Sequence, residues 1–479
     1  MEQQERSKML GTMPMGRLVP KVSVPIMVSM LVQALYNIVD GIFVARYSPN
    51  ALTAVSLAFP IQLLMIAVAT GLGVGINSLI SRKLGQKRAE EAREAARCGM
   101  LLELCGFVVF LLFGLLGSHS FFHVFTPDPE LQQMAGDYLR IVTVFSFGLF
   151  LSISFERMMQ ATGNTMLSMT TQLTGAVINI ILDPIMIFGL LGTPQMGVAG
   201  AAAASVHNLV LAALFLGLAL VLPFLTGQIP QIGGMLLGFV LNQLKNHELK
   251  VVWRGFRPEA SVFRSILAVG FPSIIMQSIS SFMNVFMNLI LIAYGNTAVS
   301  VLGVYFKLQS FVFMPVFGLG NGLVAIVGYN YGARLRERVY DAIRVAVKLA
   351  VIIMAVGTVA FLLIPEVLLS LFEAEGASDL TAMGVVALRI ISSHFILAAI
   401  GITLSTVFQA IGKGFYSLLM SLCRQLIVLL PAAWILSRLG GVNAVWWCFP
   451  VAEAVSLALC LALFRKVDVR MLKPLGQEA

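Results

Sequence analysis

The chain has 479 residues, of which 58% are hydrophobic and only 11% are charged. Because a soluble domain carries about a quarter charged residues, this composition excludes a soluble multidomain protein and indicates that lipid is the main solvent. The formal net charge of +9 does not indicate a nucleic-acid partner. The basic residues lie in connections between apolar segments, where they set membrane orientation.

Twelve apolar stretches, each long enough to cross a hydrocarbon core of about 30 Å, follow one another along the chain. The amino-terminal segment leads straight into the first of them and lacks the features of a cleaved signal peptide. The sequence therefore predicts an all-α polytopic membrane protein with twelve transmembrane helices. The predicted spans are roughly 20–46, 51–81, 94–117, 137–160, 167–190, 197–222, 262–294, 298–330, 340–365, 381–410, 416–438 and 441–465.

The connections between these spans differ in charge. Basic residues crowd the second and eighth connections, with Arg82, Lys83, Lys87, Arg88, Arg93 and Arg97 in one and Arg334, Arg336 and Arg338 in the other. The third and ninth connections instead carry the acidic residues Asp128, Glu130, Glu373, Glu375 and Asp379. Because cytoplasmic loops are rich in Lys and Arg, we expect both termini to lie in the cytoplasm, with the protein in an inner (cytoplasmic) membrane.

An internal repeat organises the chain. Residues of the first half recur at a constant separation of 247: Pro25, Asn37, Gln62, Gly71, Gly73, Gly75 and Gly85 correspond to Pro272, Asn284, Gln309, Gly318, Gly320, Gly322 and Gly332. Later matches, such as Gln160 with Gln409, are separated by 249 residues. Since the second copy begins after an even number of spans, the halves are predicted to be parallel repeats around a central cavity. The repeated glycines lack the Lys and Ser/Thr of a phosphate loop and predict close helix packing or a bending point.

This repeat divides the chain into an amino-terminal six-helix lobe (1–222), a linker (223–261) and a carboxy-terminal six-helix lobe (262–479). The linker contains an extra apolar segment at about 223–241, which is interrupted by Pro230 and several glycines. A thirteenth crossing here would place the following basic cluster outside the cell. We therefore expect an interfacial or re-entrant helix.

Ionisable side chains inside apolar helices are functional candidates, because burying a charge in lipid costs free energy. Asp40 lies late in the first span and shares a helix face with Asn37, three residues earlier. Asp183 follows Asn179 by four residues, and Pro184 leaves one helix carbonyl without its usual partner. These groups predict a proton or cation site. The alternative is that they only hydrogen-bond between helices and hold the bundle together.

Three further acids lie within spans. Glu156 lies one turn before Gln160. If its side chain faces the cavity, it would pair with a cationic substrate. Otherwise it would pair with groups around Arg157, near the cytoplasmic edge of the membrane. Glu103 and Glu453 have no polar companion on their own helix faces, so we expect packing or snorkelling for both.

The second half carries mainly basic embedded charges, and Met287 stands where the repeat would place a counterpart of Asp40. We therefore expect ion coupling in the first lobe. Lys307, Arg389 and Arg424 would either bind an anionic substrate or pair with helix carbonyls and the lipid interface. The five cysteines and five histidines show no metal-ligand spacing, so no metal site and no cofactor besides the coupling ion is expected.

The segments YNIVDGIFVA, QATGNT, NIILDPIMIFG and VYFKLQSFVFMPVFGLGNGLVAIVGYNYGA resemble the multidrug and toxic compound extrusion (MATE) family, in particular its bacterial branch related to DinF and MepA. The resemblance implies two six-helix lobes that expel drugs or metabolites by antiport with protons or sodium. It implies a coupling-ion site at Asp40, Asn179 and Asp183, with Na⁺ as an alternative to the proton. The chain lacks the seventh-helix acid of the sodium-coupled NorM-like branch, and its linker insertion departs from the family pattern.

The sequence thus predicts alternating access, in which the lobes rock about the cavity while Asp40 and Asp183 exchange an ion against substrate. We expect substrate contacts at Tyr36, Asn37, Glu156 and Gln160, cationic amphipathic small molecules as substrates, and a monomer in the lipid bilayer with no nucleic-acid partner. The rival transport functions are a flippase for a lipid-linked precursor and an exporter of anionic metabolites. An enzyme is disfavoured because no nucleophile has a matching base, and a channel because no filter-like segment is present.

Overall fold

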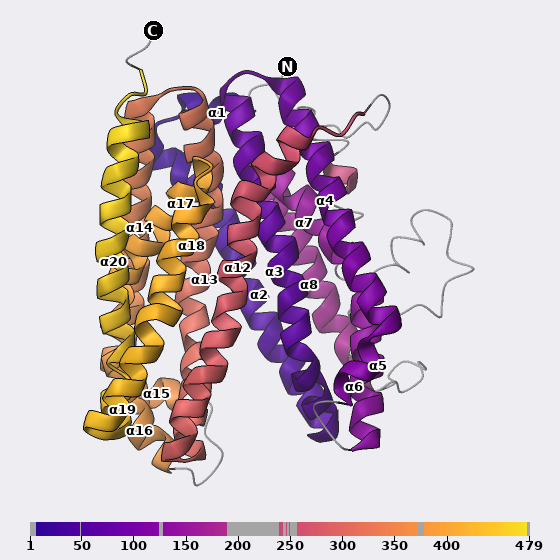
Figure 1. The fold of residues 1–479 in the computed structure, drawn as a ribbon, viewed down its shortest axis with the longest axis vertical. Coiled ribbons are helices and arrows are strands. Elements are labelled where there is room, and N and C mark those ends of the chain that lie inside the picture. The colour runs from indigo at the N-terminus through magenta and orange to yellow at the C-terminus, as the bar shows by residue number, and fades with distance from the viewer. Residues whose placement is uncertain are drawn as a thin grey trace.

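The computed structural model describes residues 6–47, 49–123, 128–188, 239–242, 246, 249, 256–371 and 378–476. Within the helices, the side chains at 6, 36–56, 119, 178–179, 182–184, 186–188 and 378–379 lie outside this description. The described residues form helices joined by short connections, without a strand among them. The described part of the chain begins at residue 6 and ends at residue 476 at the same end of the helical bundle, hereafter the terminal end (Figure 1).

The first half consists of α1 (Arg6–Thr12), α2 (Met15–Tyr47), α3 (Pro49–Gly85), α4 (Ala89–Leu116), α5 (Ser118–Phe122), α6 (Pro129–Val144), α7 (Phe147–Ala161) and α8 (Thr165–Phe188). The second half consists of α12 (Ala260–Leu291), η3 (Ile292–Tyr294), α13 (Asn296–Gly332), α14 (Arg336–Leu363), α15 (Pro365–Ser370), α16 (Ser378–Ser392), α17 (Phe395–Ala410), α18 (Gly414–Leu422), η4 (Cys423–Val428), α19 (Leu429–Val445), α20 (Cys448–Val467) and η5 (Asp468–Leu472). Of the η elements, η3 is a 3₁₀-helix, whereas η4 and η5 are π-helices.

Among the described residues, eight helices are long and apolar enough to cross a membrane, and two bent helix pairs raise the number to ten. α8 coincides with the predicted span at 167–190. The predicted span at 197–222 lies outside the described residues, and every other predicted span coincides with a helix or a helix pair. The protein is therefore an all-helical, multi-pass membrane protein.

Two predicted spans are bent rather than straight. α6 and α7 meet at 41°, and α16 and α17 meet at 49°. At the first bend, Thr143 and Ser146 donate their hydroxyls to backbone carbonyls of the preceding turn. At the second, Ser392 and Ser393 do the same. Such side-chain bonds compete with the helical ladder and favour a bend, which the apolar pattern alone did not indicate.

The boundary between the last two spans also differs from the prediction. The predicted break at 438–441 falls on Gly440 and Gly441, whose backbone is non-helical, with Gly441 at φ 69°. A further helical turn then continues to Val445 before α20 begins at Cys448. Glycine permits this left-handed conformation, which ends the straight part of α19.

The repeated glycines mark where the two halves touch. α12 packs along α3, and α2 packs along α13. A Cβ added at Gly71 would lie 2.7 Å from the backbone nitrogen of Ile274, and one at Gly318 would lie 2.8 Å from that of Met27. These two contacts are equivalent under the 247-residue repeat. They confirm that the glycines serve close helix packing.

The tightest of the glycine contacts between the halves lie at the terminal end. A Cβ at Gly85 would lie 2.0 Å from the carbonyl oxygen of Tyr329, and one at Gly332 would lie 2.2 Å from that of Arg82. These positions are again equivalent under the repeat. From this end the helices of the two halves diverge toward the opposite end of the bundle (Figure 1).

The first helix of each half contributes to the core of the other half. Leu18 and Val22 of α2 belong to the large hydrophobic cluster of the second half, whereas Ile266 of α12 belongs to a cluster of the first half.

The predicted lobe boundary at 222 lies outside the described residues. Of the extra apolar segment, only Phe239 and its neighbours to residue 242 are described, and the ring of Phe239 packs against Phe155.

Candidate functional site

The predicted ion site lies on two neighbouring helices. Asp40, with Tyr36 and Asn37, is in the last third of α2, and Asn179 and Asp183 are on α8, which packs along α2. The side chains of these five residues lie outside the described part of the chain. Their assembly into one site therefore stays a prediction.

Gln160 joins an acid and a base inside the first half. Its Nε2 donates to Oε1 of Glu156 at 2.7 Å and to the hydroxyl of Ser168 at 3.0 Å. Its Oε1 accepts from Nη1 of Arg157 at 2.9 Å. Gln160 is fully buried, while Glu156 and Arg157 are 6% and 5% exposed. The amide thus uses both of its N–H groups and its oxygen, which fixes the orientation of the carboxylate and the guanidinium.

The local sequence explains this arrangement. Glu156, Arg157 and Gln160 lie within one turn of α7, and Ser168 lies in the first turn of α8, just after the connection. Gly73 of α3 gives Arg157 its space, because a Cβ there would lie 2.9 Å from the Arg157 Cγ. The repeated glycine therefore shapes the polar network as well as the helix packing.

Glu103 of α4 is a candidate that the sequence analysis left aside. It is fully buried, and neither of its carboxyl oxygens has a hydrogen-bond partner among the described residues. The opposite charge that acts on it is Arg157, from α7. An acid in an apolar span was the available signal. Glu103 has no polar neighbour on its own helix face, so packing or snorkelling was expected. A sequence does not show which residues of other helices face such an acid.

Two of the three basic residues singled out in the second half, Arg389 and Arg424, lie near a carboxylate. Arg424 of η4 has its Nη1 3.7 Å from Oε2 of Glu453, which is 3% exposed. Glu453 is therefore buried beside a polar group of another helical element, so of the two alternatives expected for it, packing rather than snorkelling applies. Arg389 lies near the exposed Glu366, with 3.5 Å between nitrogen and oxygen. Lys307 is exposed on α13. Arg389 and Arg424 thus each face a carboxylate of the protein itself.

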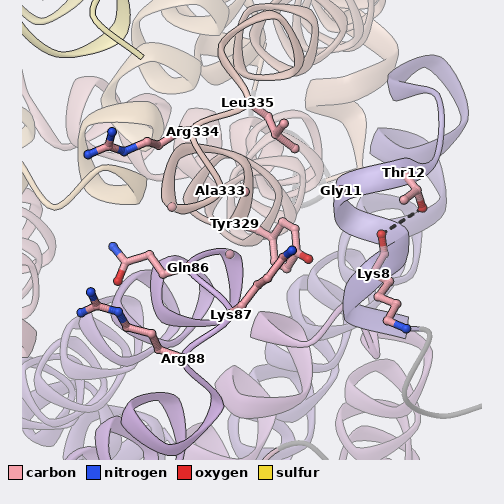
Figure 2. A pocket seen from close by; sticks show the side chains of 12 residues that line it. Lys8, Gly11, Thr12, Gln86, Lys87, Arg88, Tyr329, Ala333, Arg334 and Leu335 are labelled. Carbon is pink, nitrogen blue, oxygen red and sulfur yellow. Dashed lines mark hydrogen bonds between the residues drawn. The ribbon is translucent and has the colours of Figure 1, made fainter. Parts of the chain in front are cut away.

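The two basic connections meet around a pocket of about 710 Å³ at the terminal end (Figure 2). Its lining includes Lys8 of α1, Lys87 and Arg88 from the α3–α4 connection, and Arg334 from the α13–α14 connection. Lys87 and Arg334 are equivalent under the repeat, and both adopt the left-handed conformation, with φ of 62° and 58°. The second and eighth connections therefore lie on one side, together with both chain ends, as the charge pattern predicts.

Comparisons with known proteins agree with the repeat. The MatE family model matches residues 25–185 and 272–435, one stretch in each half. The chain is 25% identical over 445 residues to the multidrug export protein MepA of Staphylococcus aureus, and these residues cover 92% of each protein.

Two solved structures extend this similarity to the fold. One shows the outward-facing conformation of a multidrug resistance MATE family transporter of the MOP superfamily (TM-score 0.87, 26% identity, 98% of this chain and 99% of that chain). The other is a MOP superfamily transporter from Pyrococcus furiosus, for which the reverse polarity of the binding pocket suggests a different function (TM-score 0.86, 26% identity, 97% of this chain and 98% of that chain).

Proposed function

The chain belongs to the MatE family of membrane transporters, and from this premise we propose that it exports small cationic amphipathic molecules from a bacterial cell in exchange for protons or Na⁺. The buried network of Glu156, Arg157 and Gln160 carries the proposal, because a carboxylate held inside an apolar bundle attracts a cation that has lost its water. The name of the similar protein from S. aureus, a multidrug export protein, supports the same class of substrate.

The terminal end faces the cytoplasm in this proposal. Lys8, Lys87, Arg88 and Arg334 gather there around one pocket, and cytoplasmic loops are the ones enriched in basic residues. Because the halves are in contact at this end, a cytoplasmic terminal end would make this a state closed toward the cytoplasm. Loading of substrate from inside would require the contacts of Gly85 and Gly332 to separate.

The ion couples to this movement through α2. Two carboxylates in a medium of low dielectric do not both ionise without a counter-charge, so Asp40 and Asp183 would hold a proton or share a cation. Met27 lies on the same helix as Asp40, nearer the amino-terminal end, and its backbone packs against Gly318 of the other half. A change in α2 on ion binding would therefore reach the contact between the halves directly.

Cationic substrates are favoured over anionic ones by the pairing of the arginines. Arg389 and Arg424 each face a carboxylate, so an anion would have to displace Glu366 or Glu453. A cation at Glu156 would instead displace the hydrogen bond that the neutral amide of Gln160 donates, while Arg157 stays bonded to the amide oxygen. Gln160 would then hold the carboxylate in place before the substrate arrives.

The test is ethidium efflux from cells that express the wild-type protein, Asp40→Asn or Asp183→Asn, with the proton and sodium gradients collapsed separately. We expect wild-type efflux to depend on one gradient and each variant to lose it at normal expression. Glu130→Gln, which changes an exposed acid in the first turn of α6, is the control and should export like wild type.

Wild-type efflux in both aspartate variants would show that these acids only support the fold. If the wild-type protein moves no cationic dye, export of an anionic metabolite or flipping of a lipid-linked precursor replaces the present proposal.

A further inference from the structure

The second half buries a cluster of titratable groups that the proposed coupling site does not use. Its centre is Glu453 of α20, with Arg424 of η4 and His394 at the bend before α17. Oε2 of Glu453 lies 3.7 Å from Nη1 of Arg424 and 3.8 Å from Nδ1 of His394. The other ring nitrogen of His394 lies 3.5 Å from the hydroxyl of Tyr305, on α13. Four helical elements thus bring one acid, one arginine, one histidine and one tyrosine together.

The cluster lies where the helices are irregular. His394 occupies the 49° bend between α16 and α17, and Arg424 lies in the π-helix η4. α20, which carries Glu453, packs against both η4 and α17. π-helices are frequent at functional sites, because their loosened hydrogen-bond ladder can rearrange. A change of charge at Glu453 therefore acts on two deformable points of the backbone.

The hydrogen bonding of the cluster is incomplete. Oε1 of Glu453 and Nδ1 of His394 are both buried, and neither has a hydrogen-bond partner among the described residues. Gly401 borders the unpaired oxygen, since a Cβ there would lie 3.3 Å from it. A buried carboxylate oxygen without a donor is costly in a medium of low dielectric. Binding a proton would remove the charge and end that cost.

We propose that Glu453 binds a proton in a second ion site, located in the second half, and that Arg424 and His394 are its positioning residues. A metal cation does not fit, because the guanidinium of Arg424 carries a permanent positive charge beside the carboxylate.

Proton binding changes the balance of charge in a defined way. With Glu453 ionised and His394 neutral, Arg424 and Glu453 neutralise each other. A proton taken up from water leaves Arg424 without its counter-charge, and its side chain, 21% exposed, turns toward water. Since Arg424 lies in η4, this movement displaces the π-helix and the helices α18 and α19 on either side of it.

The other titratable groups near Glu453 are few in the described part of the chain. Besides Tyr305, His394 and Arg424, the groups that interact with this cluster are Cys448 and Cys460, both on α20 itself. Tyr416 of α18 packs its ring on Phe408 instead. Arg438 of α19 lies over the ring of Trp434.

The direct test is infrared spectroscopy of the full-length protein in lipid nanodiscs, recorded across a range of pH. Protonated carboxylic acids show a carbonyl band that carboxylates lack. We expect wild-type protein to show such a titrating band and Glu453→Gln to lose it. Glu366→Gln is the matched control, because Glu366 also lies beside an arginine, Arg389, but is exposed. Identical titrations of wild type and Glu453→Gln would overturn the proposal.

A second variant decides the matter if Glu453→Gln does not fold. In Arg424→Gln the acid loses its positive neighbour, so its carbonyl band should persist to higher pH than in wild type. An unchanged titration in this variant would mean that Glu453 is not the group that binds the proton.

The consequence for transport rests on the proposed export function, whereas the proton site itself does not. Substrate-induced proton release, followed with a pH-sensitive dye, should fall by one proton per protein in Glu453→Gln while the contribution of Asp40 remains. Failure of ethidium export in wild type would refute the proposed function and leave the infrared test intact. If Glu453→Gln loses the carbonyl band but still exports ethidium normally, Glu453 binds a proton that is not coupled to transport.

Discussion

The two halves share their packing and differ in the charges that they bury. Gly85 and Gly332 each lie against a backbone carbonyl of the other half, at equivalent positions of the repeat. By contrast, Glu103 of α4 corresponds to Ala350 of α14, and both positions are buried. A backbone contact tolerates no added atom, so both copies need glycine. A buried charge needs only suitable partners within its own half, which leaves each half free to specialise.

Breaking the shared contact should have the largest effect. Alanine at Gly85 or Gly332 places a Cβ about 2 Å from a backbone oxygen, which cannot move aside like a flexible side chain. We expect each variant to destabilise the closed terminal end by about 3 kcal/mol or more. Spin labels on the two basic connections should report a longer distance between the halves.

The control for this experiment is Gly303→Ala, on the same helix as Gly332, where an added Cβ meets no atom within 4 Å. It should leave the label distance unchanged. A large effect of only one of the two contact glycines would contradict the equivalence of the halves.

Removing the bridging amide of the first half should cost less. Gln160→Ala leaves Glu156 and Arg157 buried without their shared partner, for which we expect a loss of about 2–3 kcal/mol. Its repeat counterpart Gln409 is only half-buried. Gln409→Ala should therefore lower the thermal denaturation midpoint of the purified protein much less than Gln160→Ala. Equal losses would show that the network contributes nothing specific to the first half.

A hydrogen bond across the halves offers a finer test. The hydroxyl of Ser78 donates to the carbonyl of Gln409 at 2.7 Å, whereas the counterpart of Ser78 in the repeat is Ala325, which has no hydroxyl. Ser78→Ala makes the halves alike at this position, and we expect a loss of about 0.5–1 kcal/mol. Thermal denaturation should show a small decrease, and a decrease as large as that of Gln160→Ala would contradict this account.

The smallest effect is expected at the exposed ion pair. Glu366→Gln removes the partner of Arg389 at a position where both side chains are half exposed. Water and salt screen such pairs, so we expect less than about 0.5 kcal/mol, and no difference from wild type in high salt. Denaturation midpoints at low and high salt check this. A salt-independent loss would indicate that the pair has a structural role.

The fold followed from the sequence to the extent that lipid imposes it. In a hydrocarbon core the backbone must satisfy its own hydrogen bonds, so long apolar stretches become helices, and the described helices agree with the predicted spans. The bends near Ser146 and His394 were missed, because they depend on hydroxyls that bond to the preceding turn. Such local competition leaves the mean hydropathy of a span unchanged.

Only part of the candidate site could be predicted from the sequence. Glu156 and Gln160 lie on one helix face, four residues apart, and their hydrogen bond was within reach of the sequence pattern. Glu103 and Glu453 were set aside, because neither has a polar companion on its own helix face and the arginine that acts on each lies on another element. The grouping of Asp40 with Asp183 stays a prediction.

The sequence by itself determined the membrane class, the repeat and the side of the basic connections, because hydropathy, identity at fixed spacing and charge are properties of a linear chain. Only the tertiary structure decided which glycines lie against a carbonyl of the other half and which buried acids meet an arginine. Those facts depend on which helices become neighbours. That choice is made by packing between segments far apart in the sequence, where a contact such as that of Gly332 with Arg82 leaves no room for another atom.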